Sequence, residues 1–566
     1  MLRRCFFVRA VNEVYLDYYM REEELKNVIQ GDVLVDDATR AHYSRDASIF
    51  EVTPSFVVFP KDAEDVKHLV KLVSEAKEKG DNVSLTARSA GTDMGGGPLT
   101  ESIVMDFTKY FKKISEVSVE NNEGYITSEP GVFYRDFEKE TLKSGYLLPS
   151  YPASRSLCAI GGIVANDSGG EKTLKYGKTH DYVERLNVVL SDGELHEIKA
   201  LTPQELAAKE ALHTFEGEIY RKMHALLETN YDVVHAAKPN VSKNSAGYDL
   251  WNVWDRTRFD LTKLFVGSQG TLGIVTEAEF RLVKTKPHSG MLVIFLKDFD
   301  SIIPVVKEVL PFKPSSFESF DDKTFKLALK FLWGFIKILA KNPFSLAFSF
   351  LPEFFLVLTK GMPKLILLAE FEEDTEEAVV TKIDELRKKL LPLHLPMRVA
   401  KTKEESDKYW AIRRESFNLL RQRVRGMQAA PFVDDIIVRP EFIPEFLPKL
   451  YQILDKYEFF STVAGHMGDG NFHIIPLLKL ANESDRAKIH PAMDEVYTLV
   501  LSYGGSITAE HNDGLIRSPY LTQMFGEKVT NLFAEVKTIF DPHGIFNPGK
   551  KVGASIEYAM AHIKKS

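Results

Sequence analysis

The spacing of apolar residues predicts a strand–helix–strand unit near the beginning of the chain. Residues 57–60 form a short apolar run closed by proline, which is typical of a strand end. Residues 62–79 carry apolar side chains at helical spacing with charge on the other face, which predicts an amphipathic helix. Two further apolar runs, 82–86 and 102–106, predict strands. The segment between those two runs is rich in glycine.

A second region of alternating strands and helices begins near residue 290. Residues 291–296 and 365–371 are predicted strands, and residues 302–310 and 374–391 are predicted helices. This alternation favours an α+β domain, separate from the first unit, that would hold a substrate.

A basic and aromatic segment, residues 323–358, interrupts the alternation. Its first part predicts a helix that is apolar except for one face of lysines, namely Lys323, Lys326, Lys330, Lys337 and Lys341. Such a helix can lie in a membrane interface. Pro352 and Glu353 split the apolar residues that follow, so no run reaches the length of a membrane span. A helical hairpin on the protein's own core, an oligomer contact and a membrane-surface contact are the alternatives.

Composition places the 566-residue chain among soluble globular proteins of two or three domains, since 44% of it is hydrophobic and 27% is charged. The net charge of −8 gives no indication of nucleic-acid binding. Cys5 and Cys158 are the two cysteines, which favours a reducing compartment and excludes an iron–sulfur cluster held by this chain alone. Arg9 interrupts a short apolar run, so we expect no signal peptide and a cytoplasmic protein.

Three glycine-rich segments lie next to predicted strands, at residues 86–98, 158–170 and 267–278. A backbone without side chains can direct its N–H groups toward a pyrophosphate. One such loop is more often an ordinary turn, but three of them indicate a long cofactor that crosses several turns. None has the spacing G-x-G-x-x-G at the start of a helix, which excludes a Rossmann nucleotide site.

In this order the three loops resemble the FAD-binding domain of the vanillyl-alcohol-oxidase (PCMH-type) flavoprotein superfamily. The resemblance implies an α+β fold, in which a two-lobed FAD-binding domain is joined to a cap domain with an antiparallel sheet. The implied divisions are an N-terminal extension at 1–50, the FAD-binding domain at 51–287, the substrate domain at 288–505 with a helical insertion at 322–362, and a C-terminal segment at 506–566 that returns to the FAD domain.

The same resemblance implies which residues contact FAD. The first loop would hold the pyrophosphate, and the third would lie near the isoalloxazine ring or the ribityl chain. The implied cofactor-binding residues are Arg88, Ser89, Ala90, Gly91, Thr92, Asp93, Gly95, Gly96, Pro152, Gly161, Gly162, Asn166, Gly169, Gly170, Gly273, Ile274 and Asn547.

Some members of the superfamily attach FAD covalently through a histidine in the first loop. This chain has Thr92 and Asp93 there, and Cys158 does not lie at the spacing of the known cysteinyl link. We therefore expect non-covalent FAD. Residues 244–249 (Asn-Ser-Ala-Gly-Tyr-Asp) also resemble a family segment, whereas Gln269 replaces the usual glutamate.

Histidines and a glutamate near the C-terminus predict a metal site. His466 and His473 flank the glycine-rich stretch 467–470, and Glu510-His511 follows a strand-like run. Two imidazoles and a carboxylate, with an imidazole to spare, are suited to an open catalytic site for zinc, iron or manganese. A lone histidine is more often structural, but two that frame such a turn are hard to explain by packing.

These motifs resemble those of the D-2-hydroxy-acid dehydrogenase branch of the superfamily. The resemblance implies His466, His473 and Glu510 as ligands of a divalent metal, most naturally zinc. It implies Asn471 facing the substrate and His511 as the general base. Residues 410–415 (Trp-Ala-Ile-Arg-Arg-Glu) resemble a family helix whose first arginine holds the substrate carboxylate, which points to Arg413, with Arg414 as the alternative.

One departure lies beside this site. Relatives have E-H-G-x-G where this chain has Glu510-His-Asn-Asp-Gly514. Asparagine tolerates a left-handed backbone, so we expect the turn to survive. Asp513 adds a negative charge near the site, which is a candidate cause of altered substrate preference.

The resemblance therefore implies an FAD- and metal-dependent enzyme that oxidises a small 2-hydroxy acid, with D-lactate as the first candidate. Glycolate and D-2-hydroxyglutarate are the next candidate substrates. The resemblance is also compatible with a flavoprotein subunit that passes electrons to a separate iron–sulfur protein or quinone, and with a non-redox FAD transferase. A homodimer and a peripheral position on the cytoplasmic membrane face, through residues 323–358, are further expectations.

Overall fold

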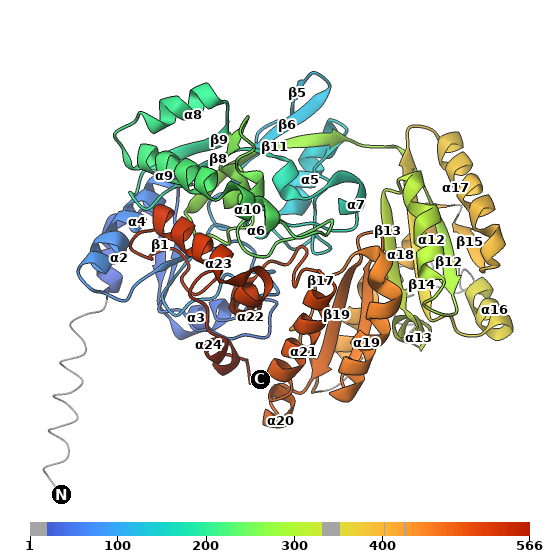
Figure 1. Cartoon of the computed structure of the whole chain (residues 1–566). Helices are drawn as coiled ribbons and strands as arrows, with labels where there is room; N and C mark the ends of the chain where they lie inside the picture. Colours follow the sequence, from blue (N-terminus) through green and yellow to red (C-terminus); the bar gives the residue numbers. More distant parts are fainter. Residues whose placement is uncertain (1–19, 331–350, 401, 424–425, 566) are drawn as a thin grey trace, which may run out of the picture.

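Three β-sheets organise the part of the chain that the computed structural model describes, residues 20–330, 351–400, 402–423 and 426–565 (Figure 1). Two sheets lie in the first half of the chain and the third lies in the second half. The mixture of helices with largely antiparallel sheets confirms the predicted α+β class. The domain boundaries given above remain a prediction.

The first sheet has the strand order β1-β2-β4-β3, with β2, β4 and β3 parallel and β1 antiparallel at the edge. Its elements are α2 (Glu22–Val28), β1 (Asp32–Leu34), α3 (Asp37–Tyr43), β2 (Phe56–Phe59), α4 (Ala63–Glu78), β3 (Leu85–Arg88) and β4 (Ile103–Asp106). Asp62 caps α4 by accepting a hydrogen bond from the Asp65 N–H. The amphipathic helix is confirmed, but β3 starts three residues later than predicted, where its partner β4 begins to pair with it.

The second sheet has the order β10-β9-β8-β11-β6-β5, and β7 also pairs with β11. Its strands are β5 (Ser118–Glu120), β6 (Glu123–Ser128), β7 (Tyr146–Leu147), β8 (Val183–Val189), β9 (Leu195–Leu201), β10 (Phe259–Asp260) and β11 (Ile274–Lys284). The helices of this lobe are α5 (Tyr134–Lys143), α6 (Ile160–Asn166), α7 (Thr173–Tyr176), α8 (Pro203–Glu210), α9 (Phe215–Thr229), α10 (Tyr231–Ala236) and α11 (Thr262–Phe265). The central strand β11 alternates between buried and half-buried side chains, which fits a sheet with one face on a core.

The third sheet is antiparallel, with the order β15-β12-β14-β13-β18-β19-β16 and with β17 on β19. Its strands are β12 (His288–Leu296), β13 (Ser316–Asp321), β14 (Leu365–Glu373), β15 (Met397–Ala400), β16 (Gln428–Ala429), β17 (Ile436–Ile437), β18 (Phe460–His466) and β19 (Asn471–Leu478). Its helices are α12 (Ile302–Val309), α13 (Asp322–Lys330), α16 (Leu351–Lys360), α17 (Glu376–Leu390), α18 (Lys403–Arg423), α19 (Ile443–Lys456), α20 (Glu483–Arg486) and α21 (Ile489–Ser502).

Helices cover both faces of this sheet, which explains why its central strands are almost continuously apolar. Along β12, Leu292 and Ile294 join the core under α12, α17, α19 and α21. The alternate residues Met291 and Val293 join a smaller core under α13 and α18. On this second face α18 packs on β12 and β15, and α13 contacts both α18 and β18, the strand that ends at His466.

The C-terminal segment contains α22 (Gly514–Arg517), α23 (Leu521–Phe540) and α24 (Ile556–Ala561). It reaches the first sheet, where the Leu85 N–H donates to the Ile545 carbonyl and the Asn547 N–H donates to the Leu85 carbonyl. The C-terminal segment thus pairs with the first lobe, which is the lobe built on the first sheet.

Residues 331–350 of the predicted insertion lie outside the described residues, and the flanking helices α13 and α16 are described. In α16, the buried Glu353 carboxylate pairs with Arg398 at 2.6 Å and with Lys408 at 3.0 Å, and it accepts a hydrogen bond from the Tyr409 hydroxyl. Within the described ranges, the helices are all too short or too polar to cross a membrane. The contacts of Glu353 attach α16 to the protein's own core.

Candidate active site

A cavity of about 620 Å³ lies where the three sheets meet. It is lined by the first glycine-rich loop at Arg88–Asp93, by parts of the second and third loops, and by side chains of the third sheet and its helix α18. The lining includes the metal-ligand candidates His466, His473 and Glu510. The fold thus brings the three loops and the histidines, which are far apart in the sequence, to one cavity.

The loops present backbone rather than side chains to this cavity. A Cβ atom added at Gly162 would meet no protein atom within 4 Å, so this glycine opens directly on the empty space. A Cβ at Gly161 would lie 2.6 Å from Ser89 Oγ, and one at Gly273 would lie 2.8 Å from Val188, so the loops also pack closely on their neighbours. A large cavity with a backbone floor fits FAD.

Twelve of the implied cofactor-binding residues line the cavity: Arg88, Ser89, Ala90, Gly91, Thr92, Asp93, Pro152, Gly161, Gly162, Asn166, Gly169 and Gly273. Cys158 lines it too, and burial raises the pKa of its thiol to about 12, which fits a small buried residue rather than a reactive one.

The histidines are carried by the hairpin β18–β19. His466 ends β18 and pairs with Asn471 across the hairpin, while His473 pairs with Ala464, so both imidazoles come from one end of the ladder. The His466 and His473 Nε2 atoms lie 3.0 Å and 3.3 Å from the same oxygen, Glu510 Oε1. Two ring nitrogens and a carboxylate oxygen therefore converge on one point.

Buried carboxylates hold the other nitrogen of each ring. Glu318 Oε1 is 2.6 Å from His466 Nδ1, and Asp434 Oδ1 is 3.2 Å from His473 Nδ1. Asp434 Oδ2 also lies 3.2 Å from His511 Nδ1. Burial opposes the charge of His473, but the carboxylates of Asp434 and Glu510 together outweigh burial and raise the pKa of the imidazole to about 10. Outer carboxylates of this kind orient metal-binding histidines.

Asp435 is a further carboxylate near this point, since ligand atoms of Asp435, His473, Glu510 and His511 all lie within 4.8 Å of one another. Its Oδ2 accepts hydrogen bonds from the N–H groups of Ala509, Glu510 and His511 and from the Thr508 hydroxyl. Asp435 is thus engaged with this segment, and the predicted donors His466, His473 and Glu510 are of the chemical types that suit a divalent cation.

Comparison with known proteins places these features in a family. Residues 54–199 match the model described as "FAD binding domain", and residues 285–551 match "FAD linked oxidases, C-terminal domain". The chain belongs to the FAD-linked oxidases. This confirms the resemblance inferred from the glycine-rich loops and the histidine motifs.

Curated relatives of this FAD-linked oxidase include D-2-hydroxyglutarate dehydrogenase of Pseudomonas putida, which is 29% identical over 93% of this chain and 51% of its own length. The glycolate oxidase subunit GlcD of Bacillus subtilis is 27% identical over 92% of this chain and 94% of its own. The D-lactate dehydrogenase of Anaerostipes hadrus is 26% identical over 93% and 96%. The chain spans about half the length of the first of these relatives.

Solved structures show the same fold. The p-cresol methylhydroxylase structure aligns with a TM-score of 0.65 and 17% identity over 94% of this chain and 97% of its own. An alkyldihydroxyacetonephosphate synthase aligns with a TM-score of 0.65 and 16% identity over 93% and 85%. These likenesses confirm the PCMH-type fold of the FAD-linked oxidase.

The other five implied cofactor residues, Gly95, Gly96, Gly170, Ile274 and Asn547, do not line the cavity. Their contacts shape the loops instead. The Asn547 side chain donates to the carbonyls of Gly97 and Gln269 and so joins the first loop to the third. Ile274 lies in the core of the first lobe, and a Cβ at Gly96 would lie 2.8 Å from Phe50.

A row of amides and one carboxylate connects the loops. Asp93 accepts hydrogen bonds from the N–H groups of Gly95 and Gly97 and from the Asn166 side chain. Gln269 Nε2 in turn donates to Asn166 Oδ1 at 3.1 Å. The Arg88 guanidinium donates to the backbone carbonyls of residues 43 and 45, so it attaches the start of the first loop to the segment that follows α3.

Arg413 and Arg414 of α18 both line the cavity. The Arg413 guanidinium contacts Glu318, and no atom of the described residues accepts a hydrogen bond from its Nη2. Arg414 Nη2 lies 2.6 Å and 2.5 Å from the two oxygens of Glu171. Arg413 therefore retains a buried donor for a ligand.

Asn471 and Asp513 lie away from the cavity lining. The Asn471 side chain is fully buried and donates to Asp435 Oδ1 and to the Ile436 carbonyl, so it braces the site instead of facing the cavity. The Asp513 carboxylate pairs with Lys551 Nζ at 2.8 Å, and both side chains are fully buried. The added charge at position 513 is therefore neutralised locally.

Glu318, Asp434 and Asp435 are site residues that the sequence motifs did not indicate. Glu318 has no local signal, because it meets His466 across neighbouring strands that are far apart in sequence. The adjacent Asp434 and Asp435 did carry a signal, since two acids inside an apolar run are unusual unless they are paired.

Proposed function

We propose that this FAD-linked oxidase removes a hydride and a proton from a D-2-hydroxy acid to give the 2-oxo acid. The observation that carries the proposal is the meeting of His466, His473, Glu510, His511 and Arg413 in the same cavity as the three backbone loops. The names of the relatives agree with a 2-hydroxy acid as the substrate class.

The loops at 88–93, 161–169 and 268–273 would hold FAD, which when bound supplies the hydride acceptor. His466, His473 and Glu510 would hold a divalent cation, zinc by preference and iron or manganese as alternatives. The positive charge of such a cation would lower the pKa of the substrate hydroxyl and of the imidazole beside it.

Arg413 binds the substrate carboxylate, because its planar guanidinium can donate two parallel hydrogen bonds and its Nη2 is available. His511 takes the hydroxyl proton, and Asp434, 3.2 Å from its Nδ1, holds the ring in place. FAD held by the three loops would supply the acceptor for the α-carbon hydrogen as hydride, while His511 holds the hydroxyl proton. The electron pair of the O–H bond becomes the carbonyl bond of the 2-oxo acid.

D-lactate is the first candidate substrate, and D-2-hydroxyglutarate is the second. The specific observation in favour of the second is Arg414, another guanidinium in the same cavity that could pair with a distal carboxylate in place of Glu171.

Since two cysteines cannot bind a cluster within this chain, we propose that the electrons pass to a separate iron–sulfur protein or a quinone. Failure of a soluble quinone and of a ferredoxin-type protein to reoxidise the reduced flavin would contradict this.

The experiment that tests the proposal is anaerobic bleaching of the bound flavin. D-lactate, L-lactate, glycolate and D-2-hydroxyglutarate are added in turn, before and after treatment with a chelator. We expect a D-acid to bleach the flavin, chelation to abolish the bleaching, and zinc to restore it. Bleaching that is unaffected by chelation would refute the role of the cation, and absence of bleaching with every acid would refute the reaction class.

A further inference from the structure

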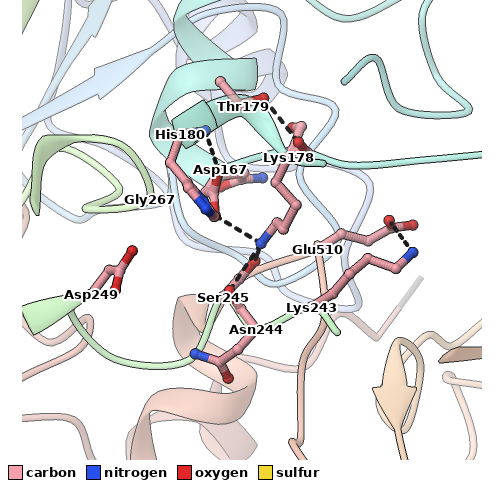
Figure 2. A network of polar contacts seen from close by, with 12 residues as sticks. Asp167, Lys178, Thr179, His180, Lys243, Asn244, Ser245, Asp249, Gly267 and Glu510 are labelled. Atoms are coloured by element: carbon pink, nitrogen blue, oxygen red, sulfur yellow. Dashed lines mark hydrogen bonds and ion pairs between the residues drawn. The ribbon is translucent and has the colours of Figure 1, made fainter. Parts of the chain in front are cut away.

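A buried lysine lies directly behind the proposed cation ligands. Lys243 belongs to the segment that follows α10 in the second lobe, and its side chain is 1% exposed. Its Nζ lies 3.3 Å from Glu510 Oε2 (Figure 2). The same Nζ lies 3.3 Å from Asp469 Oδ2 and 3.3 Å from Asn471 Oδ1. Lys243 does not line the cavity, whereas Glu510 does.

The two oxygens of Glu510 have different partners. Oε1 faces the Nε2 atoms of both histidines, and Oε2 faces Lys243. A Cβ atom added at Gly169, in the second glycine-rich loop, would lie 2.9 Å from Glu510 Oε2. The carboxylate is therefore confined between a lysine and a loop of the flavin cavity, and Lys243 fixes which oxygen turns toward the histidines.

We propose that Lys243 is a positioning residue that holds Glu510 Oε2, so that Oε1 is presented to a divalent cation at His466 and His473. This inference rests on the proposed function and extends it, because it makes a residue of the FAD-binding half responsible for the affinity of the cation site. The Lys243 ammonium also offsets the negative charges of the buried Asp469 and Glu510 carboxylates, both of which lie 3.3 Å from it.

A second buried lysine supports the same segment at its backbone. Lys178 Nζ donates to the Ala509 carbonyl at 2.9 Å. It also pairs with Asp167, at the end of α6, at 2.8 Å (Figure 2). The side chain of Glu510 is thus held by one lysine of the second lobe, and the carbonyl of the preceding residue is held by another. The cation site is consequently assembled by contacts between the two halves of the chain.

The test measures zinc affinity in the FAD-loaded protein after its metal has been removed, by competition with a chromophoric chelator. We expect Lys243→Met to bind zinc 10–100-fold more weakly, the usual effect of removing an outer partner of a metal ligand, with FAD content unchanged. The matched control is Lys551→Met, because Lys551 is also a fully buried lysine paired with an aspartate, Asp513, but does not contact Glu510.

A double-mutant cycle shows whether Lys243 acts through Glu510. Glu510→Gln should weaken zinc binding strongly, and adding Lys243→Met to it should change the affinity less than twofold further. If Lys243→Met does not yield folded protein, Lys243→Gln is measured in the same way. Zinc affinity within twofold of the parent in the Lys243 variant, or full additivity in the cycle, would overturn the inference. Absence of zinc binding by the parent protein would instead overturn the proposed cation site itself.

Discussion

Asp435 holds the segment that carries Glu510 and His511, and replacing it with asparagine should destabilise the protein measurably. The Asp435 carboxylate accepts five hydrogen bonds, four at Oδ2 and one at Oδ1 from Asn471 Nδ2. Burial raises the pKa of this carboxyl, but the charges of His511, His473 and Arg517 together lower the pKa below its usual range.

The magnitude follows from the atoms that Asp435→Asn exchanges. The amide oxygen can keep the four donors at Oδ2, but each bond changes from charge-assisted to neutral, which costs about 1 kcal/mol per bond. The amide NH₂ then faces Asn471 Nδ2, and the donor left without an acceptor costs about 1–3 kcal/mol. Removal of a buried charge returns about 2–3 kcal/mol. We expect a net loss of about 2–5 kcal/mol in the free energy of unfolding.

The assay is urea unfolding, followed by tryptophan fluorescence and by release of flavin. The control is Asp249→Asn, because burial raises the pKa of Asp249 and its carboxylate accepts a hydrogen bond from only one side chain of the described residues, Asn252. That change should alter the free energy of unfolding by less than about 1 kcal/mol. Equal effects of the two changes would refute the reasoning, since Asp435 would then contribute no more than an ordinary buried acid.

Three further predictions test other parts of the site and fold. Arg413→Lys keeps the charge but loses the planar pair of donors, so kcat/KM should fall about 10–100-fold while zinc affinity is unchanged; equal activity would remove Arg413 from substrate binding. Gly169→Ala should weaken zinc binding about 10-fold or more, because its Cβ would lie 2.9 Å from Glu510 Oε2, and unchanged affinity would show that the carboxylate can shift freely. Burial opposes the charge of His196, but Asp192 and Glu216 raise its pKa to about 9, so its stabilising contribution is complete below about pH 6.5 and lost as the pH rises through 9. His196→Gln should therefore destabilise the protein by about 1–2 kcal/mol at pH 6 and have no effect at pH 10, and a pH-independent effect would contradict the assignment.

Local sequence patterns predicted those parts of the site that a single turn brings together. His466 and His473 are close because one hairpin carries both, and a glycine-rich turn between apolar strands is visible in the sequence. Glu318 could not be found in this way. It lies opposite His466 in the register of β13 and β18, and that pairing depends on a strand order in which distant strands become neighbours. The contacts of Lys243 could likewise not be predicted from local sequence, since its partners come from the other half of the chain.

The same distinction explains the strand and helix boundaries. The amphipathic helix α4 was predicted closely because both its apolar stripe and its Asp62 cap are local signals. The start of β3 was not predicted closely, because a strand begins where a partner strand is available. Strand β4 supplies partners only from Leu85 onward. The insertion at 322–362 was recognised as an interruption, yet its anchor, the buried Glu353, became evident only from its contacts with Arg398 and Lys408.

The departures from the family pattern at Gln269 and Asn512 are connected through contacts of their side chains. Gln269 Oε1 accepts a hydrogen bond from the Gly514 N–H, and its Nε2 donates to Asn166 Oδ1, which a glutamate could not do when ionised. Asn512 adopts a left-handed backbone with φ of 66°, and its side chain donates to the carbonyls of Asn166 and Gly267. Amides at both positions therefore tie the third loop and the end of α6 to the segment that follows His511. Because these contacts use neutral groups, the alignment of the flavin loops with the proposed metal ligands does not depend on a charge at position 269.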